Sequence, residues 1–269
     1  FITNKTRSKF IQTEIPITFK SHKDFVDRIE SKISPKTKAI YLSHITSSTG
    51  LIFPVKEIVE LAKKHNVLSI IDGAHVPGHI YLNIKELNPD IYTGTCHKWL
   101  LSPKGVSFLY VKQDIQSQID PLIISWGYNN KKIERTRFQD EHLWQGTRDM
   151  SPFLTIPKAL EFRETFNWNE ISNLCKNRIL QFGYELQTEL NLNPVSKLST
   201  QFLGQMLSFD LGIHPFKLDQ VKQFLAIDKI VIPVFEWENK LLMRISLNGY
   251  NSEEDIDQLK QTLKKIIKL

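Results

Sequence analysis

Short apolar runs alternate with amphipathic stretches through about the first 120 residues of the chain. Each apolar run is too short for a buried helix and has the length of a buried strand. Strands that alternate with helices are typical of crossover units, so we predict an α/β fold with a mostly parallel sheet. The predicted strands are residues 39–43, 67–71, 90–93 and 106–111, with a helix at residues 54–64 that has Pro54 in its first turn.

Polar and titratable side chains follow three of these strands at the points where the strands end. Ser43 and His44 follow the first, the segment 72–75 (Asp-Gly-Ala-His) follows the second, and the segment 95–98 (Thr-Cys-His-Lys) follows the third. In parallel sheets, ligands bind beyond the carboxyl ends of the strands. The sequence therefore predicts a site at this edge of the sheet.

The pattern changes at about residue 151, where helical periodicity begins and a second group of strands follows. We expect strands at 206–211, 229–234 and 241–247, and helices at 216–225 and 253–267. Ser252, three residues before Asp255, predicts a capping box at the start of the last helix. These elements indicate a smaller α+β domain, so we predict a large α/β domain at 1–155 and a small domain at 156–269.

Composition excludes several classes of protein. Apolar residues make up 41% of the chain, which argues against disorder, and the net charge of +6 comes from scattered lysines. Scattered lysines favour solvated surfaces over a nucleic-acid interface. No apolar run approaches the roughly 20 residues that span a bilayer, and only two cysteines are present. We therefore expect no nucleic-acid partner, no membrane span, no disulfide framework and a reducing, cytoplasmic location.

Lys98 and Asp72 are the strongest candidates for chemistry. A lysine amine can form a Schiff base with a carbonyl compound, and pyridoxal phosphate needs a carboxylate beside its ring nitrogen. Taken singly, Lys98 is most simply an exposed lysine and Asp72 a turn residue before Gly73. Together they stand at two strand ends, each near a histidine, and this favours function. His75 could then contact another substituent of the cofactor ring.

A metal site is the alternative for the same part of the chain. Asp72, His75, His79 and His97 have metal-binding side chains, and His75 and His79 are four residues apart. Pro77 and Gly78 stand between these two histidines and would break the helix that this spacing needs. We therefore expect no metal.

Several motifs in order give the chain a family resemblance. Residues 71–78 (Ile-Asp-Gly-Ala-His-Val-Pro-Gly), 96–99 (Cys-His-Lys-Trp) and 102–105 (Ser-Pro-Lys-Gly) resemble the class V aminotransferase family of pyridoxal-phosphate enzymes, nearest to its isopenicillin N epimerase-like branch. Residues 43–47, 144–149 and 244–246 match as well. The resemblance implies the fold-type-I architecture of pyridoxal-phosphate-dependent transferases. It also implies that the chain lacks the family's N-terminal part, which carries a phosphate cradle and a ring-stacking residue.

The resemblance assigns a role to each matching residue. Lys98 corresponds to the lysine that bonds to the cofactor, Asp72 to the partner of the pyridine nitrogen, and His75 to a contact of the ring oxygen. Thr95, His97 and Thr147 correspond to phosphate-binding residues, and Arg244 corresponds to a substrate-binding residue. Thr147 matches a residue that reaches the partner subunit's cofactor, which implies a homodimer with shared sites. Arg244 matches the arginine that holds the substrate carboxylate, a group that guanidinium binds through two parallel hydrogen bonds.

The implied reaction is chemistry at the α-carbon of an amino acid, with three outcomes left open. Epimerisation follows from the branch, and a C–S lyase of the cysteine desulfhydrase type or a transaminase of the same family are alternatives. The segment 230–240 contains no cysteine, which disfavours a persulfide-forming desulfurase. The alternative from another class is a catalytically silent dimeric fragment or scaffold protein.

Overall fold

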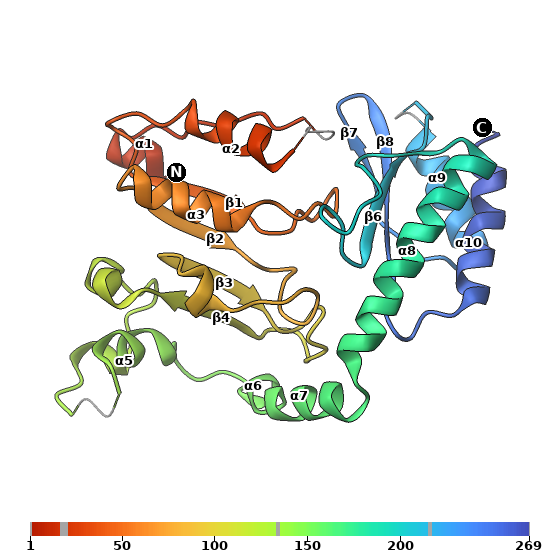
Figure 1. Ribbon diagram of the computed structural model, residues 1–269. Coiled ribbons are helices and arrows are strands. Elements are labelled where there is room, and N and C mark those ends of the chain that lie inside the picture. The colour runs from red at the N-terminus through yellow and green to blue at the C-terminus, as the bar shows by residue number, and fades with distance from the viewer. Residues whose placement is uncertain (1, 17–20, 133–134, 215–216, 269) are drawn as a thin grey trace.

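A computed structural model describes residues 2–16, 21–132, 135–214 and 217–268 (Figure 1). The elements of the first part are α1 (Ile2–Thr6), α2 (His22–Glu30), β1 (Ala39–Ser43), α3 (Val55–Lys64), β2 (Leu68–Asp72), α4 (Ile84–Leu87), β3 (Ile91–Thr95) and β4 (Ser107–Val111). Two 3-10 helices follow, η1 (Gln113–Gln118) and η2 (Trp126–Asn129). The remaining elements are α5 (Arg137–Leu143), α6 (Ser151–Leu154), α7 (Ile156–Thr165), α8 (Trp168–Leu190), β5 (Asn193–Pro194), β6 (Met206–Asp210), α9 (Leu218–Ile227), β7 (Val234–Trp237), β8 (Lys240–Ser246) and α10 (Glu253–Ile266).

The first sheet has the order β1-β2-β3-β4. β1, β2 and β3 pair in parallel, as the alternation of strands and helices predicts, with Ser43 opposite Asp72 and Asp72 opposite Thr93. β4 pairs antiparallel with β3. A parallel return needs a crossover of a dozen or more residues, usually through a helix, and no helix lies between β3 and β4.

The second sheet has the order β5-β6-β8-β7, and all its pairings are antiparallel. Figure 1 shows α8, α9 and α10 gathered beside this sheet, with the long α8 leading to it from α7. α10 begins at the predicted capping box, in which the Ser252 side chain accepts from the Asp255 backbone N–H and Asp255 bonds back to the Ser252 N–H. This sheet with its helices has the α+β character expected from the sequence, whereas the proposed boundary at residue 155 stays a prediction.

One predicted strand of the second part is wrong. Residues 229–234 do not form a strand; β7 begins at Val234 and ends at Trp237. Val231 is fully exposed at 102% of its reference area, and Pro233 has no N–H to donate to a ladder. The apolar residues Ile230 and Ile232 pack against the core from an irregular segment instead. The predicted helix at 216–225 is found as α9, and Phe216 lies outside the described residues.

The two sheets are joined through one buried cluster. It includes Ile71 of β2 and Leu207 of β6, both with no exposed surface. Leu51, in the loop after β1, forms an isolated antiparallel bridge with Leu203, and the Ile52 N–H donates to the Phe202 carbonyl at 2.8 Å. The loop after β1 is therefore fixed against the second sheet, which brings residues of both sheets to the same edge. Among the described residues, no helix has the length and apolar character to cross a bilayer.

Candidate active site

The loops that follow β2 and β3 leave the first sheet at the same edge. Asp72 is the last residue of β2, and its carbonyl accepts from the His44 N–H at 2.8 Å. Gly73 begins the loop because a Cβ there would stand 2.2 Å from the Tyr92 ring. Gly78 turns the same loop at φ +82°, where a Cβ would meet the Trp99 carbonyl oxygen at 2.4 Å. Two glycines thus let this loop pack directly against the segment that carries Lys98.

The central contact of the site joins these two loops. Lys98 Nζ lies 3.2 Å from His75 Nε2. Desolvation lowers the pKa of Lys98, the Asp72 carboxylate opposes this effect, and the Arg244 guanidinium adds to it. The sequence predicts Lys98, Asp72, His75 and Arg244 as site residues, and the structure brings these four together. A lysine with a lowered pKa has a larger fraction of uncharged, nucleophilic amine.

The Asp72 carboxylate is oriented by its own turn. Its Oδ1 accepts from the Ala74 N–H at 2.9 Å. Burial raises the pKa of Tyr41 and of Tyr92, and the Asp72 charge raises both further. Two phenol side chains therefore stand near this carboxylate, and neither brings a positive charge to neutralise it.

His75 is buried between Trp99 and Lys98. The Trp99 Nε1–H donates to His75 Nδ1 at 3.3 Å. Burial lowers the pKa of His75 to about 3, and the positive charges of Lys98 and Arg244 add to this effect. His75 is consequently neutral at physiological pH, so it can donate from one ring nitrogen and accept at the other.

Arg244 reaches the site from β8 of the second sheet. Its Nη1 donates to the backbone carbonyl of Ser47 and, at 3.2 Å, to the Ser47 hydroxyl. The buried Arg244 Nε has no hydrogen-bond partner among the described residues. None of the ion pairs found among those residues involves Arg244. Burial lowers its pKa. An arginine that reaches from one sheet to the loop after β1 of the other, without an acid in an ion pair, is suited to bind an external carboxylate.

The two residues predicted to bind phosphate beside Lys98 have partners within the chain. The Thr95 hydroxyl donates to the Ala74 carbonyl at 2.6 Å, and His97 Nδ1 donates to the Val106 carbonyl at 3.2 Å. These bonds fix the segment that carries Lys98 to the loop after β2 and to the start of β4. The hydroxyl oxygen of Thr95 and Nε2 of His97 are left to accept or donate elsewhere, and their phosphate role stays a prediction.

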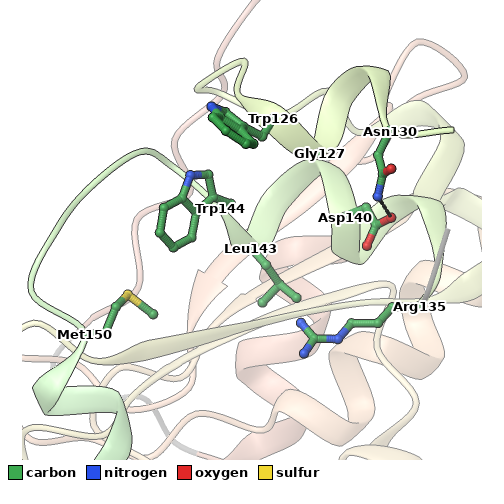
Figure 2. A pocket seen from close by; sticks show the side chains of 8 residues that line it. All are labelled: Trp126, Gly127, Asn130, Arg135, Asp140, Leu143, Trp144 and Met150. Atoms are coloured by element: carbon green, nitrogen blue, oxygen red, sulfur yellow. Dashed lines mark hydrogen bonds between the residues drawn. The ribbon is translucent and has the colours of Figure 1, made fainter. Parts of the chain in front are cut away.

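Thr147 is not part of this cluster. It is exposed in the link between α5 and α6. The same part of the chain contains a hollow of about 440 Å³, and Figure 2 shows the indoles of Trp126 and Trp144 on one side of it. On the other side the Asn130 amide donates to Asp140 Oδ2 at 3.1 Å. The residues that line the hollow include none of the predicted site residues.

Neither cysteine is placed for sulfur transfer. Both are free, and burial raises the pKa of the Cys96 and Cys175 thiols, which disfavours the reactive thiolate. In the described part of the chain, no group of three or more histidine, cysteine or acidic side chains is arranged to hold a metal ion. His79 instead donates from Nδ1 to the His75 carbonyl at 3.0 Å.

Sequence reasoning gave no role to Trp99 and Ser47, which contact His75 and Arg244 directly. Both stand inside the matching motifs, and Trp99 directly follows Lys98, which did receive a role. The available signal was the position of Trp99 next to Lys98 and of Ser47 within the matching segment 43–47. Which side chain each of them would meet depends on how the loops fold over the sheet edge, and no spacing in the sequence reports that.

Comparison with known proteins assigns the family. Residues 7–259 match the model of the aminotransferase class-V family, so the chain belongs to this family. It is 30% identical over 261 residues to isopenicillin N epimerase of Amycolatopsis lactamdurans, an alignment that covers 91% of this chain and 64% of the epimerase. It is 26% identical to hercynylcysteine sulfoxide lyase of Schizosaccharomyces pombe, covering 91% of this chain and 63% of the lyase. The chain thus spans less than two thirds of these relatives.

Solved structures confirm the fold. The apo cysteine desulfurase of Thermococcus onnurineus NA1 superposes with a TM-score of 0.81 at 19% identity, covering 99% of this chain and 68% of that one. A mutant of C-DES, a cystine C–S lyase, solved with glycine covalently linked to its PLP cofactor, gives a TM-score of 0.74 at 22% identity over 90% of this chain and 63% of that one. The predicted fold-type-I architecture is confirmed by these similarities.

Three histidines with lowered pKa values predict a fall in stability with acid. Burial lowers the pKa of His44 to about 4, that of His75 to about 3 and that of His79 to about 4, all from 6.5. As pH falls below about 6.5, the unfolded chain binds protons that the folded chain does not. The free energy of unfolding should therefore drop by up to about 1.4 kcal/mol per pH unit for each histidine, down to about pH 4.

Urea unfolding at a series of pH values between about 7 and 4 measures this slope. A His44→Gln variant removes one titrating ring and keeps a polar group beside the Tyr92 hydroxyl, which His44 Nδ1 contacts at 2.9 Å. In this variant, the free energy of unfolding should change with pH as if about one fewer proton were bound on unfolding. Equal slopes in the two proteins would show that His44 is not held neutral by the fold.

Proposed function

We propose that this chain is the catalytic part of a pyridoxal-phosphate-dependent enzyme that acts at the α-carbon of an amino acid. The observation that carries the proposal is the cluster in which Lys98 contacts His75 at 3.2 Å, with Asp72 and Arg244 close enough to shift its pKa. Family membership and the names of the relatives support it. The chain spans about 64% of the length of the epimerase. The activity proposed here is therefore that of the whole protein.

The residues present fit this cofactor. The Lys98 amine has a neutral imidazole as its hydrogen-bond partner and no acid in an ion pair among the described residues, so it is available to bond to an aldehyde. Asp72 presents a carboxylate that can accept from a pyridine N–H, and His75 offers a donor to the ring oxygen. When bound, pyridoxal phosphate supplies the electron sink that accepts the electron pair released when a bond at the α-carbon breaks.

Each side chain of the cluster then has a defined task. Arg244 binds the substrate carboxylate, and its unpaired buried Nε points to such an external partner. The uncharged Lys98 amine takes the α-proton, for which a lowered pKa is an advantage near neutral pH. Asp72 holds a positive charge on the pyridine nitrogen. We assign Thr95 and His97 to the phosphate, next to Lys98 in the chain.

Epimerisation is the reaction we favour, since two of the relatives are isopenicillin N epimerases. A C–S lyase is the second candidate. The observation that favours it is the set of relatives named as L-cysteine desulfhydrases or as a sulfoxide lyase. Desulfurase chemistry is disfavoured because Cys96 is buried with a raised pKa. We place the protein in the cytoplasm, in keeping with two unpaired cysteines.

Spectra with added pyridoxal phosphate test the role of Lys98. The wild-type chain should develop the visible absorbance band of covalently bound cofactor, and Lys98→Ala should not. Lys104→Ala, at an exposed lysine of the same loop, is the matched control and should keep the band. Arg244→Ala should also keep it while binding amino acids about ten- to a hundredfold more weakly, because charge-assisted hydrogen bonds are lost. A band that persists in Lys98→Ala would refute the proposed cofactor anchor.

We further propose that the active form is a homodimer with shared sites. Large apolar side chains are exposed around the segment that carries Thr147, including Leu122 at 99%, Trp126 at 88% and Leu154 at 78%. Exposed large apolar side chains of this kind are typical of an interface. A second copy that covers it would also bring Thr147 to the neighbouring site.

Light scattering after size-exclusion chromatography tests the dimer. Wild-type protein should elute with twice the chain mass, and Trp126→Glu should shift it toward the monomer because a charge would be buried at the interface. Val231→Glu, at an equally exposed apolar residue of the other part, should leave the mass unchanged. A monomeric wild-type protein at high concentration would contradict the proposal.

A further inference from the structure

The His75 ring is held at both nitrogens, by side chains that belong to the same loop. Trp99 Nε1 lies 3.3 Å from His75 Nδ1, and Lys98 Nζ lies 3.2 Å from His75 Nε2. Consecutive residues of the chain thus contact opposite sides of one imidazole. His75 is 7% exposed and Trp99 is 8% exposed, so water cannot readily replace either partner.

The indole determines where the proton of the imidazole lies. Indole Nε1–H can only donate, so His75 Nδ1 must carry a lone pair to accept from it. A neutral imidazole with a free Nδ1 has its hydrogen on Nε2. Nε2–H then points at the Lys98 amine, and a hydrogen bond between them forms only if that amine offers a lone pair. An ammonium group there would place two donors against each other.

The Trp99 indole is held in place by His79 and by contacts of the Trp99 backbone. Its ring stacks on His79, with centroids 4.1 Å apart and an angle of 24° between the planes. His79 Nδ1 donates to the His75 carbonyl at 3.0 Å, and its Nε2 accepts from the Gln205 N–H at 2.6 Å. Arg163 Nη1 donates to the Trp99 carbonyl at 3.0 Å. The indole therefore cannot rotate away from His75 without breaking packed contacts.

We propose that Trp99 is a positioning residue, whose indole N–H holds His75 in the Nε2–H tautomer and thereby holds the Lys98 amine in its uncharged form. The charged groups that face Lys98 are Asp72 from β2 and Arg244 from β8, and they shift its pKa in opposite directions. His75 is faced by Lys98, Arg244 and His79. The value of this arrangement for catalysis rests on the proposed function, because the uncharged amine is the form that attacks an aldehyde and accepts a proton.

Competitive labelling of the protein without added cofactor tests the proposal directly. Trace acetic anhydride at a series of pH values, followed by peptide mass spectrometry, gives the apparent pKa of individual lysines. Trp99→Phe keeps an aromatic ring to stack on His79 and removes only the N–H. It should raise the apparent pKa of Lys98 by about one unit, a tenfold loss of uncharged amine at fixed pH. The exposed Lys104 in the same digest should not change.

A double-mutant comparison separates the relay from general structural damage. If Trp99 acts through His75, then Trp99→Phe should cause no further shift of Lys98 in a His75→Ala background. An unchanged Lys98 pKa in the single variant, or the same shift in both backgrounds, would overturn the proposal. So would equal shifts of Lys98 and Lys104.

Nitrogen NMR of the wild-type protein keeps the proposal testable if the variants fail to fold. Histidine labelled with nitrogen-15 should show His75 protonated at Nε2 and bare at Nδ1 near neutral pH. A proton on Nδ1 would overturn the proposal. Neither experiment uses pyridoxal phosphate, so a negative result here leaves the proposed anchor Lys98 standing, and a chain that binds no cofactor leaves the tautomer argument intact.

Discussion

The contact between Lys98 Nζ and His75 Nε2 depends on the parallel pairing of β2 with β3. Parallel neighbours end at the same edge of a sheet, so the loops that follow them meet there. Gly73 and Gly78 then allow the first loop to pack against the second without a clash. Antiparallel pairing of these two strands would place Asp72 and Lys98 at opposite edges. The chemistry proposed for the chain therefore rests on one feature of sheet topology.

The second part of the chain completes the site from the other side. Arg244 crosses to the Ser47 carbonyl, and Gln205 donates its backbone N–H to His79. Gly204 must be small, since a Cβ there would stand 2.3 Å from His79 Nε2. Arg244, which we propose binds the substrate carboxylate, and the support of the Trp99 indole both come from this junction. Loosening it should therefore affect substrate binding and the state of Lys98 together.

Sequence reasoning recovered most of the elements that border the site. The strands at 39–43 and 241–247 were placed within one residue because short apolar runs are typical of strands, although the first is not wholly buried and Tyr41 in it is 60% exposed. The nearness of Asp72 to Lys98 followed from two strand ends in one crossover unit. The segment 229–234 misled because Ile230, Val231 and Ile232 form a short apolar run like that of a strand, while Pro233 has no N–H to donate and β7 begins only at Val234. The antiparallel direction of β4 was also not predicted.

Side-chain contacts between loops lie beyond what spacing can report. Trp99 was visible as a motif residue, yet its hydrogen bond to His75 depends on a stack with His79 and on a backbone donor at Gln205, more than one hundred residues away in the chain. The Arg244 to Ser47 contact spans 197 residues. Such contacts follow from how two sheets meet, and the local sequence does not encode that geometry.

The central claim is that Lys98, among all lysines of the chain, carries the reactive amine. Incubation with pyridoxal phosphate, reduction with borohydride and peptide mapping by mass spectrometry test it in one step. We expect a single dominant phosphopyridoxyl label, on the peptide that contains Lys98. A label spread over exposed lysines in proportion to their accessibility, or a dominant label elsewhere, would contradict it.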